Sequence, residues 1–506
     1  MRSRKPRCGA LIALAVFSTA CGNRLPAEEL RAAAGLSPAQ GEVAAPGVAA
    51  PVAGTADAGP LPTESGSAAA AGTPTPSQRP TSAGAALSHT PAASGGGPAA
   101  AANPARRGAA AAAAAGPTPA GTPTGPSAGP AASGAGSSCA PNCAPIVVAS
   151  VGTYSGIVGQ NIGGGVKALQ AWVSSVNAKG GINGHLVQLF IADDVGDPAR
   201  HRALVQQMVE ERHAIAFLFN AEVLSGQGSV DYIDRVRVPV IGSEGGGEWF
   251  HSNQYYFPQH SSGKDLPLTP LGSATVSQFP QGKKKLGTIV CADGIQVCED
   301  AKKTYPERAP KYGFDYVYNG SASLAQPDLT ANCLAARDAG AELLMILMDK
   351  NSIQRAARSC SNIGYKPIYL LNQTIENDAL ATDPLLDGAV GSGVVAPWFD
   401  TSSPAVAEFR EAMAAYAPGV DISGAPMQGW TSAKLFEKAA ARIGNPPTSE
   451  QVLQGLWSMK DETLGGLAPP RTFTPGQPAP HAVCFWSWVV KDRKFVNAVD
   501  NKVRCI

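Results

Sequence analysis

Residues 176–198 read VNAKGGINGHLVQLFIADDVGDP, and this stretch carries the signals of a helix end, a turn, a strand and a new helix. Gly180 fits the left-handed residue that follows a helix, and Asn183-Gly184 predicts a tight turn into the strand. Asp197-Pro198 predicts the N-cap and the first residue of the next helix. This order is typical of a parallel sheet with helices on its faces.

The glycine-rich loop at 179–184 could instead bind a phosphate. Phosphate loops follow the pattern GxxxxGK[ST], or GxGxxG between a strand and a helix. Here the loop follows a helix and precedes a strand, so the unpaired backbone groups facing it are carbonyls, which do not attract an anion. The loop is therefore predicted to be a connector.

Two series of apolar segments alternate with helical ones along the chain. The first predicts strands at 146–152, 185–194, 214–220 and 238–243, with a helix whose buried face carries Val166, Leu169, Val173 and Val176. The second predicts strands at 285–291, 314–320, 342–349 and 367–372, with Leu334, Ala335 and Ala339 facing inward on a helix. Helices near 403–416, 427–443 and 448–459 and a hairpin of 484–490 and 494–499 follow. The fold class is thus α/β, with two Rossmann-like lobes.

The first twenty residues have the features of a secretory signal peptide. A basic start, MRSRKPR, runs into the apolar residues 9–17 and then Ser18-Thr19-Ala20-Cys21. The last four residues resemble a bacterial lipobox, although Ser18 stands where leucine is usual. We expect residues 1–20 to be removed and Cys21 to be lipidated; the alternative is ordinary cleavage after Ala20.

Residues 21–138 are composed almost entirely of Ala, Pro, Gly, Ser and Thr. Such a segment cannot bury enough apolar surface to offset its ordering entropy, so it is predicted to be a disordered tether. A spacer between a membrane and a folded body is one interpretation, and low-complexity sequence without a role is the other.

The cysteines indicate disulfides. Of the ten, Cys8 lies in the predicted signal peptide and Cys21 at its end, which leaves eight. An even number in an exported chain favours disulfides over metal ligation, although sequence alone does not fix the pairing. Pairing of neighbours keeps each bridge within one local unit and gives Cys139–Cys143, Cys291–Cys298, Cys333–Cys360 and Cys484–Cys505. We expect no metal and no cofactor.

Catalytic patterns are missing from the sequence. There is no HExxH or GxSxG motif, and the seven histidines are scattered. Asp193-Asp194 is a carboxylate pair at a strand end, but neighbours on a strand point to opposite faces, which favours a loop or capping role. The 40 basic residues balance the 39 acidic ones, so no binding to nucleic acid is expected. The protein is not expected to be an enzyme.

The combination of Ser155-Gly156, NAKGGING (177–184) and DDVGDP (193–198) resembles the opening of type I periplasmic binding proteins of the leucine/isoleucine/valine-binding family. The resemblance extends over about 146–500. It implies a monomer of two lobes, 139–265 with 390–470 and 266–389 with 471–506, joined by three crossing segments. It also implies capture of a small polar ligand, namely an amino acid, amide or small carboxylate, and its delivery to an ABC permease. An extracellular sensor of the same fold is the alternative.

The resemblance places the ligand beyond the carboxyl ends of the strands. The residues at these ends are Tyr154, Ser155, Asn220, Ala221, Glu222, Ser243, Glu244, Gly245, Gly246, Asp293, Asp349, Asn372 and Gln373. In the family, hydroxyls and backbone amides after the third and fourth strands hold a carboxylate, which corresponds to 220–222 and 243–246; Glu244 could instead meet an ammonium. Gln373 stands where amino-acid binders have a carboxylate, and this departure disfavours a standard branched-chain amino acid.

Overall fold

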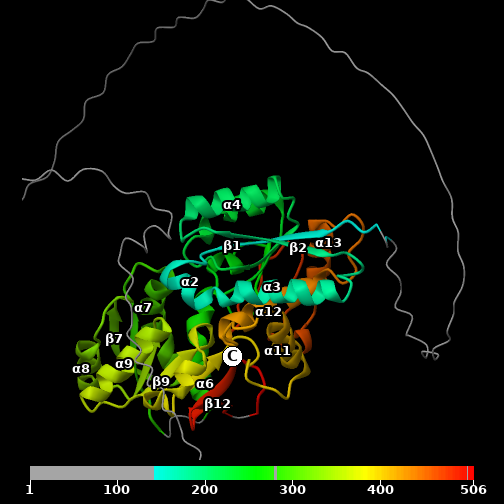
Figure 1. Cartoon of the computed structure of the whole chain (residues 1–506). Helices are drawn as coiled ribbons and strands as arrows, with labels where there is room; N and C mark the ends of the chain where they lie inside the picture. The colour runs from blue at the N-terminus through cyan, green and yellow to red at the C-terminus, as the bar shows by residue number, and fades with distance from the viewer. Residues whose placement is uncertain (1–138, 140–141, 278–281, 499) are drawn as a thin grey trace, which may run out of the picture. The chain divides into compact units, whose positions relative to one another are not determined.

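The computed structural model describes residues 139, 142–277, 282–498 and 500–506 (Figure 1). The predicted signal peptide, the lipidation of Cys21 and the tether over 21–138 lie outside these residues. Among the described helices, none combines the length and the apolar character needed to cross a membrane.

The first sheet is parallel and has the strand order β2-β1-β3-β4-β5. Its strands are β1 (Ile146–Gly152), β2 (Val187–Asp193), β3 (Ala216–Asn220), β4 (Val240–Ser243) and β5 (Tyr256–Phe257). The helices of this lobe are α2 (Gly156–Ile162), α3 (Gly164–Ala178), α4 (Pro198–Glu210), α5 (Val230–Val236), α11 (Pro404–Tyr416), α12 (Gly424–Ala439) and α13 (Ser449–Trp457). In Figure 1, α4 covers one face of the sheet, and α3 and α12 cover the other.

The second sheet has the order β12-β11-β10-β9-β8-β6-β7, and β13 pairs with β11. Its strands are β6 (Lys285–Cys291), β7 (Asp315–Ala322), β8 (Leu343–Leu347), β9 (Ile368–Asn372), β10 (Val390–Gly393), β11 (Cys484–Lys491), β12 (Lys494–Asn497) and β13 (Arg504–Cys505). Strands β6 to β10 are parallel, and β11 runs antiparallel to β10. The helices are α6 (Thr269–Val276), α7 (Gln296–Arg308), α8 (Thr330–Asp338), α9 (Lys350–Asn362) and α10 (Asp378–Thr382). The α/β fold of two sheets is thus confirmed.

The chain passes between the two sheets three times: after β5, after β10 and before β11. The sequence places residue 390 at the start of the returning first-lobe segment, but β10 belongs to the second sheet. That boundary is therefore wrong by one strand. Four residues of small or β-branched type, VGSG, gave no signal of which sheet they join.

The NAKGGING connector (177–184) adopts the predicted conformation. Gly180 follows α3 with φ +94°, and its amide donates to the carbonyl of Asn177. Asn183 and Gly184 both have positive φ, and Ile182 and His185 exchange two backbone hydrogen bonds of 2.9 Å. Asp197 caps α4 through Arg200 N, as expected.

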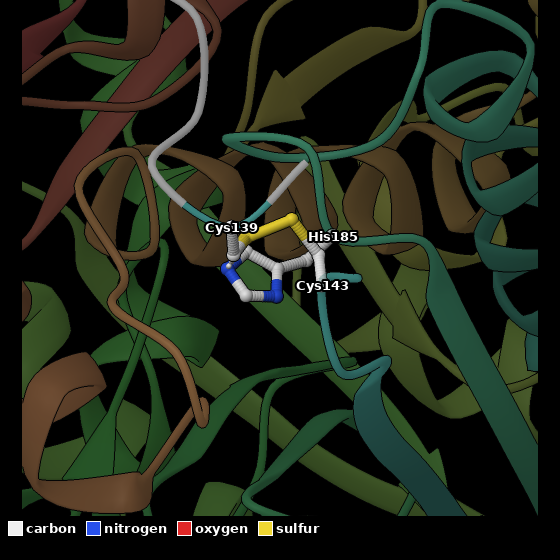
Figure 2. A group of neighbouring side chains, drawn as sticks. All are labelled: Cys139, Cys143 and His185. Atoms are coloured by element: carbon white, nitrogen blue, oxygen red, sulfur yellow. Dashed lines mark hydrogen bonds between the residues drawn. A yellow bond between two sulfur atoms is a disulfide. The ribbon is translucent and has the colours of Figure 1, made fainter. Parts of the chain in front are cut away.

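Among the described residues there are four disulfides, Cys139–Cys143, Cys291–Cys298, Cys333–Cys360 and Cys484–Cys505, and they match the predicted pairs. Three of them join neighbouring elements: Cys291–Cys298 ties β6 to α7, Cys333–Cys360 ties α8 to α9, and Cys484–Cys505 ties β11 to β13. Figure 2 shows the Cys139–Cys143 bridge beside the ring of His185, whose Nε2 lies 3.6 Å from Cys139 Sγ. Sequence gave no sign of this contact across 46 residues.

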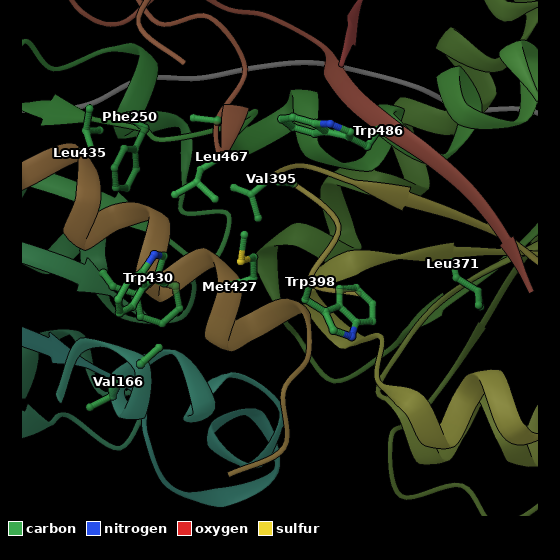
Figure 3. Packing of buried hydrophobic residues seen from close by; sticks show 14 of the residues in the cluster. Val166, Phe250, Leu371, Val395, Trp398, Met427, Trp430, Leu435, Leu467 and Trp486 are labelled. Atoms are coloured by element: carbon green, nitrogen blue, oxygen red, sulfur yellow. The ribbon is translucent and has the colours of Figure 1, made fainter. Parts of the chain in front are cut away.

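Buried aromatic and aliphatic side chains fill the space around α12, as Figure 3 shows for Met427, Trp430 and Leu435. Helix α12 lies so close to α3 that a Cβ on Gly429 would come within 2.2 Å of the carbonyl oxygen of Gly165. A larger residue at this crossing would force the two helices apart.

The predicted inward face of α8 is wrong. Cys333 and Ala336 are fully buried, whereas Ala335 and Ala339 are exposed and Leu334 is only half-buried. The Cys333–Cys360 disulfide fixes which face of this short helix meets α9. The three apolar residues therefore do not determine the buried face.

Candidate ligand-binding site

The carboxyl ends of strands from both sheets border a cavity of about 150 Å³. In parallel sheets the loops at these ends provide ligand sites, so the cavity lies where the topology predicts one. It is lined by Val158, Asn161, Ile162, Val223, Glu244, Gly245, Gly246, Leu266, Pro267, Cys291, Ile295, Val297, Cys298, Leu324, Leu347, Met348, Asp349, Asn372, Thr374 and Ile375.

Aliphatic side chains dominate this lining, and the Cys291–Cys298 disulfide and Met348 add polarizable sulfur atoms. The ionisable side chains among the described lining residues are Glu244 and Asp349. Both are acidic, and no lysine, arginine or histidine belongs to the described lining. The cavity therefore favours apolar groups over charged ones.

A wider depression of about 460 Å³ adjoins the cavity. The two share the residues Val223, Gly246, Pro267 and Val297. Carboxyl and amide side chains line its remaining part, including Glu248, Gln296 and Asp300. Polar side chains therefore lie next to the apolar cavity.

Five of the residues that the sequence predicts as ligand contacts line the cavity: Glu244, Gly245, Gly246, Asp349 and Asn372. Gly246 has φ +51°, and a Cβ there would come within 2.5 Å of the Phe250 ring, so this loop requires glycine. Contact of these five residues with a ligand stays a prediction.

The other predicted residues of the first lobe hold the sheet edge together instead of lining the cavity. Asn220 Oδ1 accepts from Val151 N at 3.0 Å, and the carbonyl of Ala221 accepts from Thr153 N at 2.7 Å. Ser243 Oγ accepts from Gly245 N at 3.2 Å. These bonds fix the strand ends that support the site.

Two further predicted residues also bond within the chain. Tyr154 places its hydroxyl 2.7 Å from Ser150 Oγ, at the end of β1. Asp293 accepts from Ser323 Oγ at 2.7 Å and from Leu324 N at 2.8 Å. Ser155 is exposed at the start of α2 and, like these two, is not among the lining residues.

Gln373 holds a crossing segment. Its side chain is fully buried, and Oε1 accepts from the amides of Val394 and Val395 at 2.7 and 3.0 Å. Nε2 donates to the carbonyl of Ala396 at 3.2 Å. Both ends of the amide are thus used by the chain where it leaves β10, and Gln373 does not line the cavity.

Glu244 occupies the place that the sequence analysis assigns to a ligand carboxylate. Its Oε1 accepts from Val223 N at 2.8 Å and its Oε2 from Glu222 N at 3.3 Å. Burial raises the pKa of Glu244 to about 8; the nearby Glu222 carboxylate adds to this, and the two backbone hydrogen bonds oppose it.

A buried charge cluster lies behind this loop. His201 is fully buried between Asp194 (2.8 Å from Nδ1) and Glu222 (3.4 Å from Nε2). Burial alone would lower the pKa of His201, but the two carboxylates raise it to about 9. Ser225 Oγ also donates to Asp194, and Trp249 Nε1 donates to Glu222 at 2.8 Å. The Asp193-Asp194 pair is therefore structural, since Asp193 accepts from the amides of Tyr154 and Val195.

Two groups of described residues have the spacing to share a metal ion. Cys139, Cys143 and His185 form one, but the disulfide uses both thiols. His251, Asp265 and His481 form the other, where two crossing segments meet and the histidine rings stack 4.2 Å apart. Burial lowers the pKa of His251, and the nearby His481 and the buried Arg471 lower it further. The positive charge of Arg471 also disfavours the binding of a cation at this place.

The model of the family described as "Periplasmic binding protein" matches residues 145–493. The chain belongs to this family. No curated protein matches the sequence.

Solved structures of periplasmic binding proteins share the fold at low sequence identity. A possible leucine/isoleucine/valine-binding protein from Rhodopirellula baltica SH 1 is 16% identical, with TM-score 0.58 over 72% of this chain and 96% of that one. A solute-binding protein from R. palustris in complex with benzoate is 13% identical, with TM-score 0.56 over 70% and 95%. A fatty acid ABC transporter substrate-binding protein from Thermomonospora curvata is 15% identical, with TM-score 0.59 over 72% and 94%.

Replacing Gln373 by Ala should lower the free energy of unfolding by about 2–4 kcal/mol, because the amides of Val394 and Val395 lose their acceptor in a buried place. Gln373→Met is the matched comparison, since it fills nearly the same volume without offering an acceptor, and it should lose a similar amount of stability. Urea denaturation measures both. A Gln373→Met variant as stable as the wild type would contradict the role assigned to Oε1.

The free energy of unfolding should fall as the pH rises from 6.5 to 9. His201 has its pKa raised from 6.5 to about 9, so its stabilisation is complete below 6.5 and is lost as the pH passes 9, by up to about 3 kcal/mol. Glu244 acts in the same direction between 4.5 and 8, because ionisation costs more in the folded state. Urea denaturation across this range should show the slope, and His201→Gln should flatten it above pH 8. A wild-type stability that rises over this range would contradict the assignment.

Proposed function

We propose that this periplasmic binding protein captures a small molecule between its lobes outside the cytoplasm and delivers it to an ABC permease. The observation that carries the proposal is the cavity, because it is lined by the carboxyl ends of strands from both sheets. Three crossing segments give the lobes a hinge, so ligand contacts with both sides would favour a closed state.

The ligand that the lining favours is largely apolar. The sequence predicts a small polar ligand, but the side chains that face the cavity are mainly aliphatic. One similar structure is described in complex with benzoate and another as a fatty acid ABC transporter component, so this fold accommodates different ligands. The ligand class of this chain therefore has to be inferred from the residues that line its own cavity.

A screen of amino acids, alcohols, amides, carboxylates and hydrocarbons should find a ligand that raises Tm of the purified protein. Val158→Trp fills the cavity from α2 and should abolish the shift, whereas Gln160→Trp, two residues along on the exposed side of α2, should keep it. Small-angle scattering should show compaction with the ligand. Tm shifts that survive Val158→Trp would place binding elsewhere and count against the proposal.

We also propose that a lipid on Cys21 holds the protein at the membrane and that residues 21–138 act as the spacer. The signal-like residues 1–20 and the composition of 21–138 support this. A single acyl chain binds membranes weakly, so a stable anchor requires the multiple chains of a processed lipoprotein.

Cys21→Ser should release the protein from the membrane fraction of the cells that produce it, because the thiol predicted to carry the lipid is removed. Cys8→Ser is the matched control, since this cysteine lies within the predicted signal peptide and should leave the membrane association unchanged. Membrane and soluble fractions are compared by immunoblot. Retention of the Cys21→Ser protein on the membrane would refute the lipid anchor.

A further inference from the structure

Two neighbouring backbone amides after β3 have the geometry to bind an anion, but a side chain of the protein already occupies them. The Glu244 carboxyl accepts from Val223 N at 2.8 Å and from Glu222 N at 3.3 Å. Glu244 is only 4% exposed and nevertheless belongs to the cavity lining. A ligand carboxylate that approached this edge would find the amides occupied and an acidic group in its path.

The facing lobe repeats the same arrangement. The N-terminus of α9 would attract an anion, but Asp349 caps it by accepting from the amides of Asn351 and Ser352 at 2.9 and 3.3 Å. Asp349 also belongs to the lining. Two features of the described lining that could bind an anion are therefore occupied by carboxyl groups of the chain.

The buried charges behind the cavity act in the same direction. His201 lies between the carboxylates of Asp194 and Glu222, so one imidazolium faces two negative groups. Lysine and arginine are missing from the described lining. An anion in this apolar cavity would therefore lose its hydration without gaining a cationic partner, which is unfavourable.

The size of the cavity limits the ligand. A dry, apolar cavity of about 150 Å³ holds one benzene ring in a well-studied engineered protein. The cavity here has a similar volume of about 150 Å³ and a similar aliphatic lining, with Glu244 and Asp349 as its acidic side chains.

We propose that the ligand is an uncharged, largely apolar molecule of about one ring or a short branched chain, and that Glu244 excludes carboxylates from the site. This inference rests on the proposed function, since it takes the cavity as the ligand site. The Glu244 carboxyl occupies the two amides that would otherwise bind a carboxylate. The aliphatic lining favours the apolar part of the ligand.

Three one-ring probes of matched size test the inference: benzyl alcohol, benzoate and benzylamine. Calorimetric titration of the full protein at pH 7 should show binding of benzyl alcohol, with benzoate at least about tenfold weaker. Glu244→Ala frees the amides of Glu222 and Val223, and should raise the affinity for benzoate relative to that for benzyl alcohol at least about tenfold. Val158→Trp should abolish all binding.

A pH series gives a second readout that does not depend on the folding of Glu244→Ala. Benzoate is ionised at both pH 6 and pH 9, whereas Glu244 has a pKa of about 8 and gains charge between them. Benzoate should therefore bind several-fold more weakly at pH 9, and Glu244→Gln should remove most of that change. The titratable groups around Glu244 are Glu222, Tyr154, Asp194 and His201 in the first lobe, and Asp349 across the cavity. His201 stays in Glu244→Gln, so the variant isolates the contribution of Glu244.

The possible outcomes distinguish the ligand class inferred here from the proposed solute-binding function. Tighter binding of benzoate or benzylamine than of benzyl alcohol overturns the uncharged ligand class, and the solute-binding function stands. Failure of all three probes overturns the size and apolar class, even if the wider screen finds another ligand. Binding that survives Val158→Trp overturns the cavity as the site, and with it both proposals.

Discussion

Backbone amides at the carboxyl edges of the two sheets are withdrawn from water, so each has to find an acceptor within the chain. Polar side chains supply these acceptors, either from the next turn of the chain or from a distance in sequence. Glu244 serves the amides after β3, Asp349 serves the start of α9, and Gln373 serves the segment that leaves β10. Because these side chains turn toward the backbone, mainly carbon and sulfur atoms face the cavity. The apolar site is thus a consequence of how the edges satisfy their own hydrogen bonds.

The same constraint connects the hinge to the cavity through one short element, η5 (Gln373–Ile375). Gln373 holds the crossing segment, while Thr374 and Ile375 line the cavity. Thr374 Oγ1 donates to the carbonyl of Glu244 at 3.4 Å and accepts from Gln428 Nε2 of α12 at 2.9 Å. Under the proposed function, a ligand in contact with Thr374 would act on residues adjacent to the crossing segment, and this contact would couple occupancy to lobe closure.

The sequence predicted the two sheets well because strand and helix periodicity is local. The NAKGGING connector and the cap at Asp197 followed from residue chemistry within a few positions. The site was harder, since strand order identifies an edge but not the direction of each side chain. Gln373 bonds 21 to 23 residues away, and Glu244 bonds 21 and 22 residues away, so neither partner is visible in a local pattern. Helix α2 has only seven residues, GIVGQNI, which are too few to show which face is buried, so the sequence does not identify Val158, Asn161 and Ile162 as lining residues.

Glu244 is an expensive way to satisfy two amides. Its burial and the nearby Glu222 carboxylate raise its pKa to about 8, which means that the folded state disfavours its charge. A glutamine has nearly the same shape and could still offer one oxygen to the amides without the repulsion. Buried groups that cost stability cluster at functional sites, where the local environment has another purpose. Here the residue with the unfavourable buried charge is Glu244, which lines the cavity. Gln373 does not line the cavity and has an uncharged amide. The contrast between these two positions supports the proposed role of Glu244 in ligand selection.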